Sequence, residues 1–259
     1  MDESEFMDAA SNGNVKTLER ILQEVCPNIA RARAVSLETA LEQTCNFHYG
    51  LMDYTPLHAA CDQGQIETVA FLLKSRAQHM LTDKNGSQPL HVACGKGFPE
   101  IVQMLVNSGA SLIHKDTLMG DLPIHWAASK GHVEVIKVLV QAGADLKAVN
   151  KEGWSPIHRA AFTGHHQALE YMINKNGPID SQTLHGDTPL HLAARNNFLD
   201  AVHVLAAKCG ARKNICNNDG LLAEEATHNE SVRAIIRGEV KEMPKSAAQD
   251  PLAFILSGR

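Results

Sequence analysis

Apolar and polar positions along the chain follow a pattern that returns about every 33 residues. Five segments share a Pro-(Leu/Ile)-His core, with histidines at positions 58, 91, 125, 158 and 191, so successive spacings are 33, 34, 33 and 33. The one extra residue falls in a turn, because Asp83 to Gly86 in one segment corresponds to Asp116 to Gly120 in the next. A fixed period of this length predicts a repeat architecture, in which neighbouring units stack to bury a shared core.

Each repeat predicts a turn followed by two helices. The proline suits the first position of a helix, where a missing N–H group costs nothing. In three repeats a short hydroxyl residue that can cap the helix precedes it: Thr55, Ser155 and Thr188. Gln88 and Leu122 stand in this place in the other two repeats. We expect those two helices to begin about 1 kcal/mol less favourably if nothing else compensates.

The second helix of each repeat is predicted by apolar residues at positions i, i+3 and i+4, such as Val69, Leu72 and Leu73. Four of these helices are followed by a glycine where a left-handed C-cap is expected: Gly109, Gly143, Gly177 and Gly210. Arg76 stands there in the remaining repeat. We therefore expect an irregular exit from that helix.

The signature T-P-L-H-x-A is intact at residues 55–60 and 188–193. The chain thereby resembles the ankyrin-repeat family over five full repeats, from about residue 51 to 216. Residues such as Phe6, Ala10 and Leu18 lie 51 positions before their counterparts in the first full repeat, which indicates an N-terminal capping repeat. A degenerate closing repeat begins near Asn218. The resemblance implies an all-α, stand-alone solenoid of about seven stacked helix-turn-helix units with β-turn or hairpin fingers, in a domain spanning residues 1–238.

Two segments depart from the family pattern. The offset of 51 residues between the first two repeats, against a period of 33, leaves an insertion of 18 residues within positions 25–50. The segment Ala34 to Cys45 predicts a short helix with Ser36 as N-cap; it either packs beside the first turn or projects toward a partner. In the tail, residues 239–259, Asp250 and Pro251 lead into an apolar run. This predicts either a short docked helix or a disordered segment with an apolar docking motif.

Composition narrows the classes of partner. The chain has 24 Lys+Arg against 29 Asp+Glu, a formal net charge of −5, so it lacks a basic field for nucleic acid or an anionic membrane. No apolar run reaches the length of a membrane helix, and the N-terminus is acidic, unlike a signal peptide. Six cysteines are too sparse for a disulfide scaffold, and none form CxxC. We expect reduced thiols, a cytoplasmic protein with possible access to the nucleus, and neither a nucleic-acid nor a membrane partner.

Candidate chemistry is weak. Five of the fourteen histidines are the repeat histidine, whose role in a TPLH-type helix start is to hydrogen-bond neighbouring turns. Cys209 and Cys216 lack the short spacing of zinc sites, and Gly95 to Glu100 lacks the third glycine of a dinucleotide loop. We therefore expect no catalytic residue, metal, cofactor or small-molecule substrate. The alternative is an enzyme or metal-dependent regulator that uses the histidines; a third is a fixed structural subunit of a larger complex.

In the ankyrin family, partner contacts usually come from the turn tips and the inner face of the first helix. That resemblance maps the following candidate partner-binding residues: Leu51, Met52, Tyr54, Lys96, Leu118, Met119, Lys130, Trp154, Phe162, His185 and Arg195. Exposed apolar residues on one surface are typical interface anchors, although Trp154 and Leu118 have the alternative of packing against adjacent turns. The three basic residues favour an acidic partner, or merely form a solvated face. The leading hypothesis is a non-enzymatic adaptor or regulator that binds another protein across a concave face.

Overall fold

The structure, a computed structural model, describes residues 3–240. Its contacts divide the chain into two compact units, which we describe separately. Among the described residues, unit 1 consists of 3–127 and 137–144, and unit 2 of 128–136 and 145–240. Within the described residues the regular elements are helices, and β-structure is confined to two isolated bridges in finger loops. The expected all-α architecture is therefore confirmed.

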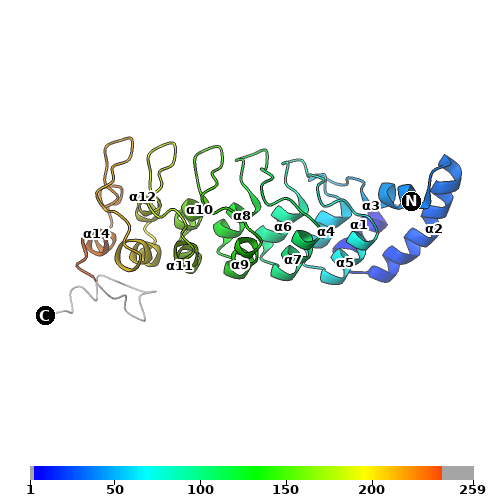
Figure 1. Cartoon of the computed structure of the whole chain (residues 1–259), viewed down its shortest axis with the longest axis horizontal. Helices are drawn as coiled ribbons and strands as arrows, with labels where there is room; N and C mark the ends of the chain where they lie inside the picture. Colours follow the sequence, from blue (N-terminus) through cyan, green and yellow to red (C-terminus); the bar gives the residue numbers. More distant parts are fainter. Residues whose placement is uncertain (1–2, 241–259) are drawn as a thin grey trace. The chain divides into compact units, whose positions relative to one another are not determined.

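Unit 1 contains paired antiparallel helices with a finger loop before each new pair (Figure 1). Its helices are α1 (Glu3–Ser11), α2 (Val15–Arg33), α3 (Leu37–Cys45), α4 (Pro56–Asp62), α5 (Ile66–Lys74), α6 (Pro89–Lys96) and α7 (Pro99–Asn107). Two further helices, α8 (Pro123–Lys130) and α9 (Val133–Gln141), contribute residues to both units. Side chains that the helical pattern assigned to the core, such as Phe6, Leu72 and Leu139, are fully buried.

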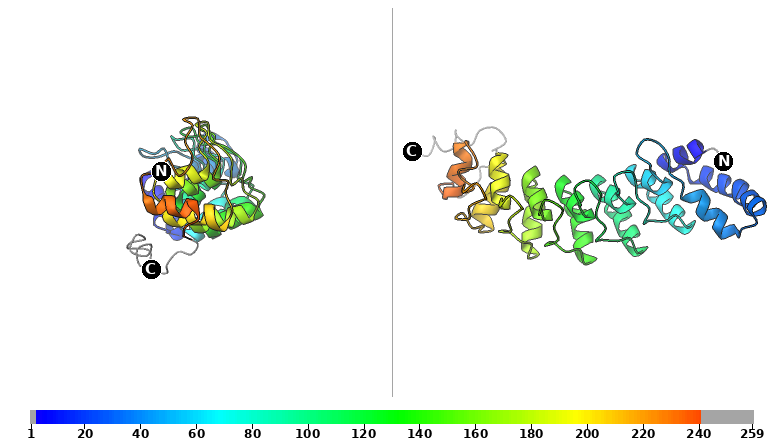
Figure 2. Two further views of the ribbon diagram at one scale, coloured as in Figure 1. Left: turned by 90° about the vertical axis from the view of Figure 1, so that its left-hand side faces the viewer. Right: turned by 90° about the horizontal axis from the view of Figure 1, so that it is seen from above.

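Unit 2 repeats the same arrangement, and the right-hand view of Figure 2 shows its helices lying side by side. Its helices are α10 (Pro156–Thr163), α11 (His166–Asn174), α12 (Pro189–Arg195), α13 (Leu199–His203), the π-helix η1 (Val204–Lys208) and α14 (Glu230–Arg237). The closing segment supplies only α14, because residues 223–226 form turns where a first helix was expected. The count of seven repeats therefore stays a prediction, and the predicted tail element lies outside the described residues.

The repeat histidine joins neighbouring turns, as expected. His58 is fully buried, and its Nδ1 lies 3.3 Å from the backbone N of Thr55, from which it accepts a hydrogen bond. The proton is therefore on Nε2, which donates to the carbonyl oxygen of Ser87 in the next finger, at 3.0 Å. In unit 2, His191 makes the corresponding bond to Leu221 O at 3.0 Å. These imidazoles have both ring nitrogens occupied by the fold.

The same histidine also bonds the helix start in the two repeats without a hydroxyl cap. Gln88 and Leu122 lack a hydroxyl, yet their backbone N–H groups donate to Nδ1 of His91 and His125, at 3.2 and 3.3 Å. One half of the capping arrangement is thus present whatever residue precedes the proline. The side-chain amide of Gln88 also donates to Met80 O at 3.1 Å. Because the histidine bond also occurs in the repeats that begin with Thr55, Ser155 and Thr188, the expected penalty for the missing hydroxyl stays a prediction.

Two helix exits differ from expectation. Arg76 adopts the left-handed conformation, with φ of +72°, so its exit follows the pattern of the glycine exits and is not irregular. In α11 the left-handed residue is Asn176, with φ of +62°, and not the predicted Gly177. Gly177 is required instead for close packing, because a Cβ there would lie 2.8 Å from the carbonyl oxygen of Met172. Left-handed backbone is costly for a non-glycine residue, which makes Arg76 exceptional.

The insertion folds as predicted into a helix, α3, capped by Ser36. It packs on a lengthened α2, with Ala40, Thr44 and Cys45 buried. It also contacts the unusual exit: Glu38 forms an ion pair with Arg76 at 2.9 Å. Asn46, just after α3, donates its side-chain amide to Arg76 O at 3.2 Å. The insertion is therefore packed beside the first turns of unit 1, the first of the two readings offered for it.

Finger loops are joined by backbone hydrogen bonds. In unit 1, Lys84 N donates to Met52 O at 3.1 Å, and Thr117 N donates to Asn85 O at 2.8 Å. Gly86 permits this approach, because its φ is +71° and a Cβ would lie 3.0 Å from the backbone N of Thr117. In unit 2, Leu184 N donates to Glu152 O at 3.1 Å. The tips of neighbouring fingers are thereby held in a fixed spacing within each unit.

Candidate functional site

In unit 1, three predicted residues meet at one pocket. Leu51, Met52 and Tyr54 line a cavity of about 320 Å³ between α1, α4 and the first finger. The other lining residues are Met7, Ser11, Tyr49, Gly50, Ala59, Asp62 and Gln63. The sequence reasoning missed Met7 and Tyr49. A signal for Met7 existed, because it stands 51 positions before the first repeat histidine and so takes that histidine's place in the capping repeat.

The walls of this pocket are apolar and well supported. Tyr49 and Tyr54 exchange backbone hydrogen bonds of 2.9 and 3.1 Å, which form a short antiparallel bridge. The Tyr54 ring stacks on His58 with centroids 5.3 Å apart. Burial, with the nearby carboxylates of Asp62 and Asp83, raises the pKa of Tyr54 to about 12, so the phenol stays neutral. Leu51, at the finger tip, is 94% exposed.

Leu118 and Met119 lie on another finger of unit 1. The buried carboxylate of Asp116 shapes it, since Oδ1 accepts the backbone N–H groups of Met119 and Gly120, both at 2.9 Å. Its Oδ2 accepts the indole N–H of Trp126, also at 2.9 Å. With the loop held in this way, Leu118 is 62% exposed. Most of the Leu118 side chain is thus exposed, and its role as a partner anchor stays a prediction.

The expected positive bias is largely offset. Lys96 forms an ion pair with Asp62 at 3.0 Å in unit 1, and Arg195 forms one with Asp187 at 2.8 Å in unit 2. Lys130, in α8, is the third basic residue of the set. Two of the three charges that favoured an acidic partner are thus balanced by carboxylates of the chain itself.

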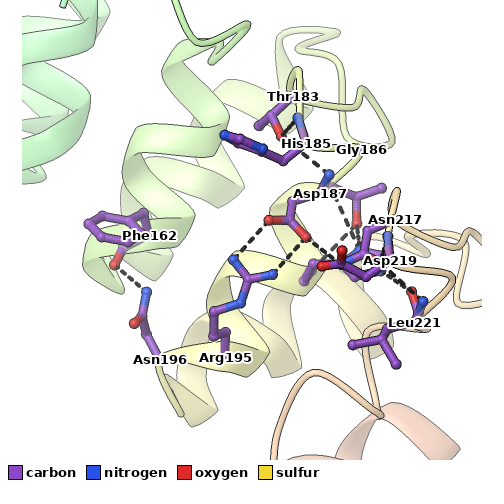
Figure 3. A network of polar contacts seen from close by, with 12 residues as sticks. Phe162, Thr183, His185, Gly186, Asp187, Arg195, Asn196, Asn217, Asp219 and Leu221 are labelled. Carbon is purple, nitrogen blue, oxygen red and sulfur yellow. Dashed lines mark hydrogen bonds and ion pairs between the residues drawn. The ribbon is translucent and has the colours of Figure 1, made fainter.

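In unit 2, Trp154 and Phe162 form an edge-to-face aromatic pair with ring centroids 5.0 Å apart. The guanidinium of Arg159 lies 5.0 Å from the Trp154 ring centroid. Trp154 is thereby half-buried by side chains of its own repeat. It has a packing role in part. Phe162 remains exposed on α10, and Asn196 donates to its carbonyl oxygen at 3.1 Å (Figure 3).

In the next repeat, an ion pair occupies the two positions that correspond to Trp154 and Phe162. Trp154 and Phe162 flank the repeat histidine by four residues on either side, and so do Asp187 and Arg195. Figure 3 shows the fork of Arg195 directed at the carboxylate, with both nitrogen–oxygen distances at 2.8 Å. Asn217 adds a third bond, at 3.0 Å. The finger base and the second turn of the inner helix therefore face each other.

The electrostatics of Asp187 follow from these contacts. Burial alone raises the pKa of this carboxyl group, but the hydrogen bonds from Arg195 and Asn217 outweigh burial and hold the pKa below its ordinary value. Asp187 is therefore charged throughout the neutral range. His185, the remaining predicted residue, lies on the finger with its Nε2 3.8 Å from Glu152. It lines a second pocket together with Asp187 and Arg195.

Within residues 3–240 no group of three or more His, Cys, Asp or Glu side chains is placed to hold a metal ion. No helix in that range is long and apolar enough to cross a membrane. The cysteines described there are free thiols, and burial raises the pKa of Cys45 to about 12. What the described side chains offer is apolar and hydrogen-bonding contact surface.

Comparison with known proteins identifies the fold. Residues 6–116, 77–150 and 124–217 match the family model described as "Ankyrin repeats (3 copies)". The ankyrin repeat domain of human ASB11 is 23% identical, with a TM-score of 0.72, over 92% of this chain and 98% of that one. The ankyrin repeat domain of Bcl-3, titled a unique member of the IkappaB protein family, is 23% identical, with a TM-score of 0.70, over 90% of this chain and 98% of that one.

No curated protein matches the chain significantly in sequence. At 23% identity the two solved structures support the fold alone. The family matches are independent of them and together extend from residue 6 to residue 217, well over half of the sequence. The chain therefore belongs to the ankyrin-repeat family.

Proposed function

We propose that this protein is a non-enzymatic adaptor or regulator that binds a partner protein through its finger tips and inner helices. Ankyrin repeats generally serve as protein–protein interaction modules. One observation carries the proposal for this chain: large apolar side chains occupy finger tips and are left in water. The exposed fraction is 94% for Leu51, 62% for Leu118 and 66% for Leu184. Large apolar side chains exposed on ordered loops are typical of interface anchors.

The surroundings of these side chains support the same proposal. The tips are held by backbone hydrogen bonds between fingers, so a partner would meet a surface that is already ordered. Little conformational entropy is then lost on binding, which favours affinity. In unit 1 the pocket beside Leu51 can accept an apolar side chain, and in unit 2 the exposed Phe162 ring can serve as an aromatic anchor.

We also propose that the protein works in the cytoplasm or the nucleus. Supporting this are six free cysteines, four of them buried at packing positions in the fold. Burial raises the pKa of Cys45 to about 12 and raises those of Cys61 and Cys94 as well, so these three thiols stay protonated. Reduced cysteines used as small apolar core residues suit a reducing compartment.

The proposal is tested by crosslinking and capture of partners from native extract, comparing two double variants of unit 1. The first, Leu51→Ser with Leu118→Ser, removes apolar tips. The second, Met80→Ser with Ile113→Ser, removes apolar side chains of similar exposure, 64% and 80%, from the segments that precede the fingers. We expect only the first variant to lose its partners. Equal capture by both, or equal loss from both, would refute a tip-centred binding surface.

Two single variants refine the map. Met119 is 49% exposed, so we expect Met119→Ala to weaken a captured partner by more than about 1 kcal/mol without changing unfolding. Trp154→Ala removes a ring that packs on Phe162 and Arg159, so we expect lower stability as well as weaker binding. Affinity by titration calorimetry and urea unfolding distinguish these outcomes.

A further inference from the structure

A pocket of about 550 Å³ opens on unit 2 beside the Asp187–Arg195 ion pair. We name it the Asp219 pocket, and it is lined by His185, Asp187, Arg195, Asp219, Leu221, Glu225, Ala226 and His228. These residues come from two fingers, from the end of α12 and from the closing turns. Figure 3 shows Asp187, Arg195, Asp219 and Leu221 converging on this region.

The charge balance of the Asp219 pocket is negative. Arg195 is already neutralised, because both oxygens of Asp187 accept its N–H groups at 2.8 Å. Asp219 and Glu225 remain, and neither has an ion-pair partner among residues 3–240. Oε2 of Glu225 accepts the backbone N–H of Leu222 at 2.7 Å, which orients the carboxylate and leaves its other oxygen available.

An apolar surface lies beside these two carboxylates. Leu221 is 40% exposed, and Ala226 lines the same pocket. A lysine or arginine side chain combines an apolar stem with a charged head, so it matches both parts of this surface. We propose that the Asp219 pocket binds a lysine or arginine side chain of the partner protein, with the stem on Leu221 and the charge between Asp219 and Glu225. This inference rests on the proposed function and specifies the partner's chemistry.

The neighbouring inner helix adds a second anchor. Phe162 is exposed on α10, which packs beside α12, and Arg195 lies between Phe162 and the pocket in Figure 3. Packed helix axes are about 8 to 10 Å apart, and an extended chain advances about 3.3 Å per residue. The pocket lies beyond Arg195, and so more than one helix spacing from Phe162. An extended partner segment therefore places an apolar or aromatic residue on Phe162 and a basic residue in the pocket about four positions away, a spacing of roughly 13 Å that keeps both side chains on the same side of the extended chain.

The test uses the full chain, ¹⁵N-labelled, and synthetic probes observed by NMR. The first probe is the peptide acetyl-Phe-Ala-Ala-Ala-Arg-amide, compared with the same peptide carrying Gln or Glu in place of Arg. We expect the Arg peptide to shift the backbone amide signals of Asp219, Leu221 and Ala226 to saturation. We also expect it to bind at least about five-fold more tightly than the Gln peptide, with the Glu peptide weakest.

Variants then locate the binding. Asp219→Asn with Glu225→Gln keeps the acceptor for Leu222 N, and it is expected to reduce affinity for the Arg peptide to that for the Gln peptide. The matched control, Asp200→Asn with Glu239→Gln, changes the net charge equally at two exposed residues of unit 2 outside the pocket. We expect this control to bind as the unaltered chain does. Urea unfolding of both variants checks that the fold is intact.

A probe without an aromatic group separates the two anchors. We expect n-butylguanidinium to shift the pocket signals and to be unaffected by Phe162→Ala, whereas the same variant weakens both the Arg and the Gln peptide. Equal affinity of the Arg and Gln peptides, or an equal loss in the Asp200/Glu239 control, would overturn the pocket. These probes need no native partner. A negative result would therefore refute the Asp219 pocket alone, and the tip-centred binding of the proposed function would still be tested by its own capture experiment.

Discussion

Acid sensitivity of unit 1 follows from two of its buried repeat histidines, His58 and His91. Burial lowers the pKa of His58 and of His91 from 6.5 to about 4. Each has Nδ1 occupied as an acceptor in the folded state, so a proton cannot be added there without breaking the cap. The unfolded chain binds these protons at the ordinary pKa. Unfolding therefore takes up protons once the pH falls below 6.5.

The sign and the size of the effect follow by linkage. Stability from these two groups is fully present above pH 6.5, is lost as the pH falls from 6.5 to about 4, and does not change further below that. At about 1.4 kcal/mol per pH unit, each histidine costs about 2 kcal/mol at pH 5. The pair costs about 4 kcal/mol, a large part of a typical domain stability of about 5 to 15 kcal/mol.

The assay is urea unfolding at pH 7.5 and pH 5.0 for the unaltered chain and for His58→Gln with His91→Gln. Glutamine can still accept the N-cap N–H, as in a Thr-x-x-Gln capping box, but it does not titrate. All other titrating groups are shared, so we expect the double variant to lose about 4 kcal/mol less than the unaltered chain on acidification. An equal loss in both proteins would refute the reasoning. NMR signals of the His58 and His91 imidazoles that titrate with midpoints near pH 6.5 would refute it independently.

Three further predictions concern packing. Gly164→Ala places a Cβ about 2.6 Å from the Phe198 ring, whereas the Cβ of Gly210→Ala, at a similar φ, meets nothing within 4 Å. We therefore expect Gly164→Ala to lower the free energy of unfolding in urea by at least about 1 kcal/mol more than Gly210→Ala does. Equal losses in the two variants would contradict the close approach of Gly164 to Phe198. Leu139→Ala removes a fully buried side chain and is expected to cost about 2 to 5 kcal/mol, and a loss below about 0.5 kcal/mol would mean that the repeat register is wrong. Deleting residues 28–45 removes α3 and its buried face, so we expect a loss well above the roughly 1 kcal/mol of a shortened loop, and unchanged stability would show the insertion to be dispensable.

The sequence predicted the helices well because the repeat constrains them strongly. A stacked unit must bury the same positions in every copy, so Leu72 and its counterparts carry the same information several times over. Features that occur once have no such support. The π-helix η1 is one of them: Cys209 N donates to Val204 O, five residues earlier, at 2.8 Å. One added residue in that repeat is absorbed by a wider turn, and helical periodicity alone does not reveal it.

Surface positions are harder to predict because the stack does not constrain them. Trp154 was chosen as an anchor from its place at a finger, but its partner across the inner helix, Phe162, decides how much of it is exposed. The positive charge of Arg195 likewise no longer favours an acidic partner, because Asp187 neutralises it. Both pairs stand four residues before and four after a repeat histidine. That spacing was visible in the sequence, and only the three-dimensional contact shows that the two positions should be considered together.

The insertion and the unusual exit at Arg76 show how two separate irregularities explain each other. In sequence they are 18 added residues and one missing glycine, with no stated connection. In the structure, α3 supplies Glu38 to the Arg76 guanidinium, and Asn46 supplies a donor to the Arg76 carbonyl oxygen. An exposed ion pair contributes little by itself, but the buried face of α3 keeps these groups in place. A left-handed arginine is thus tolerated in the repeat whose second helix ends beside the insertion. The insertion is therefore first of all a structural part of unit 1.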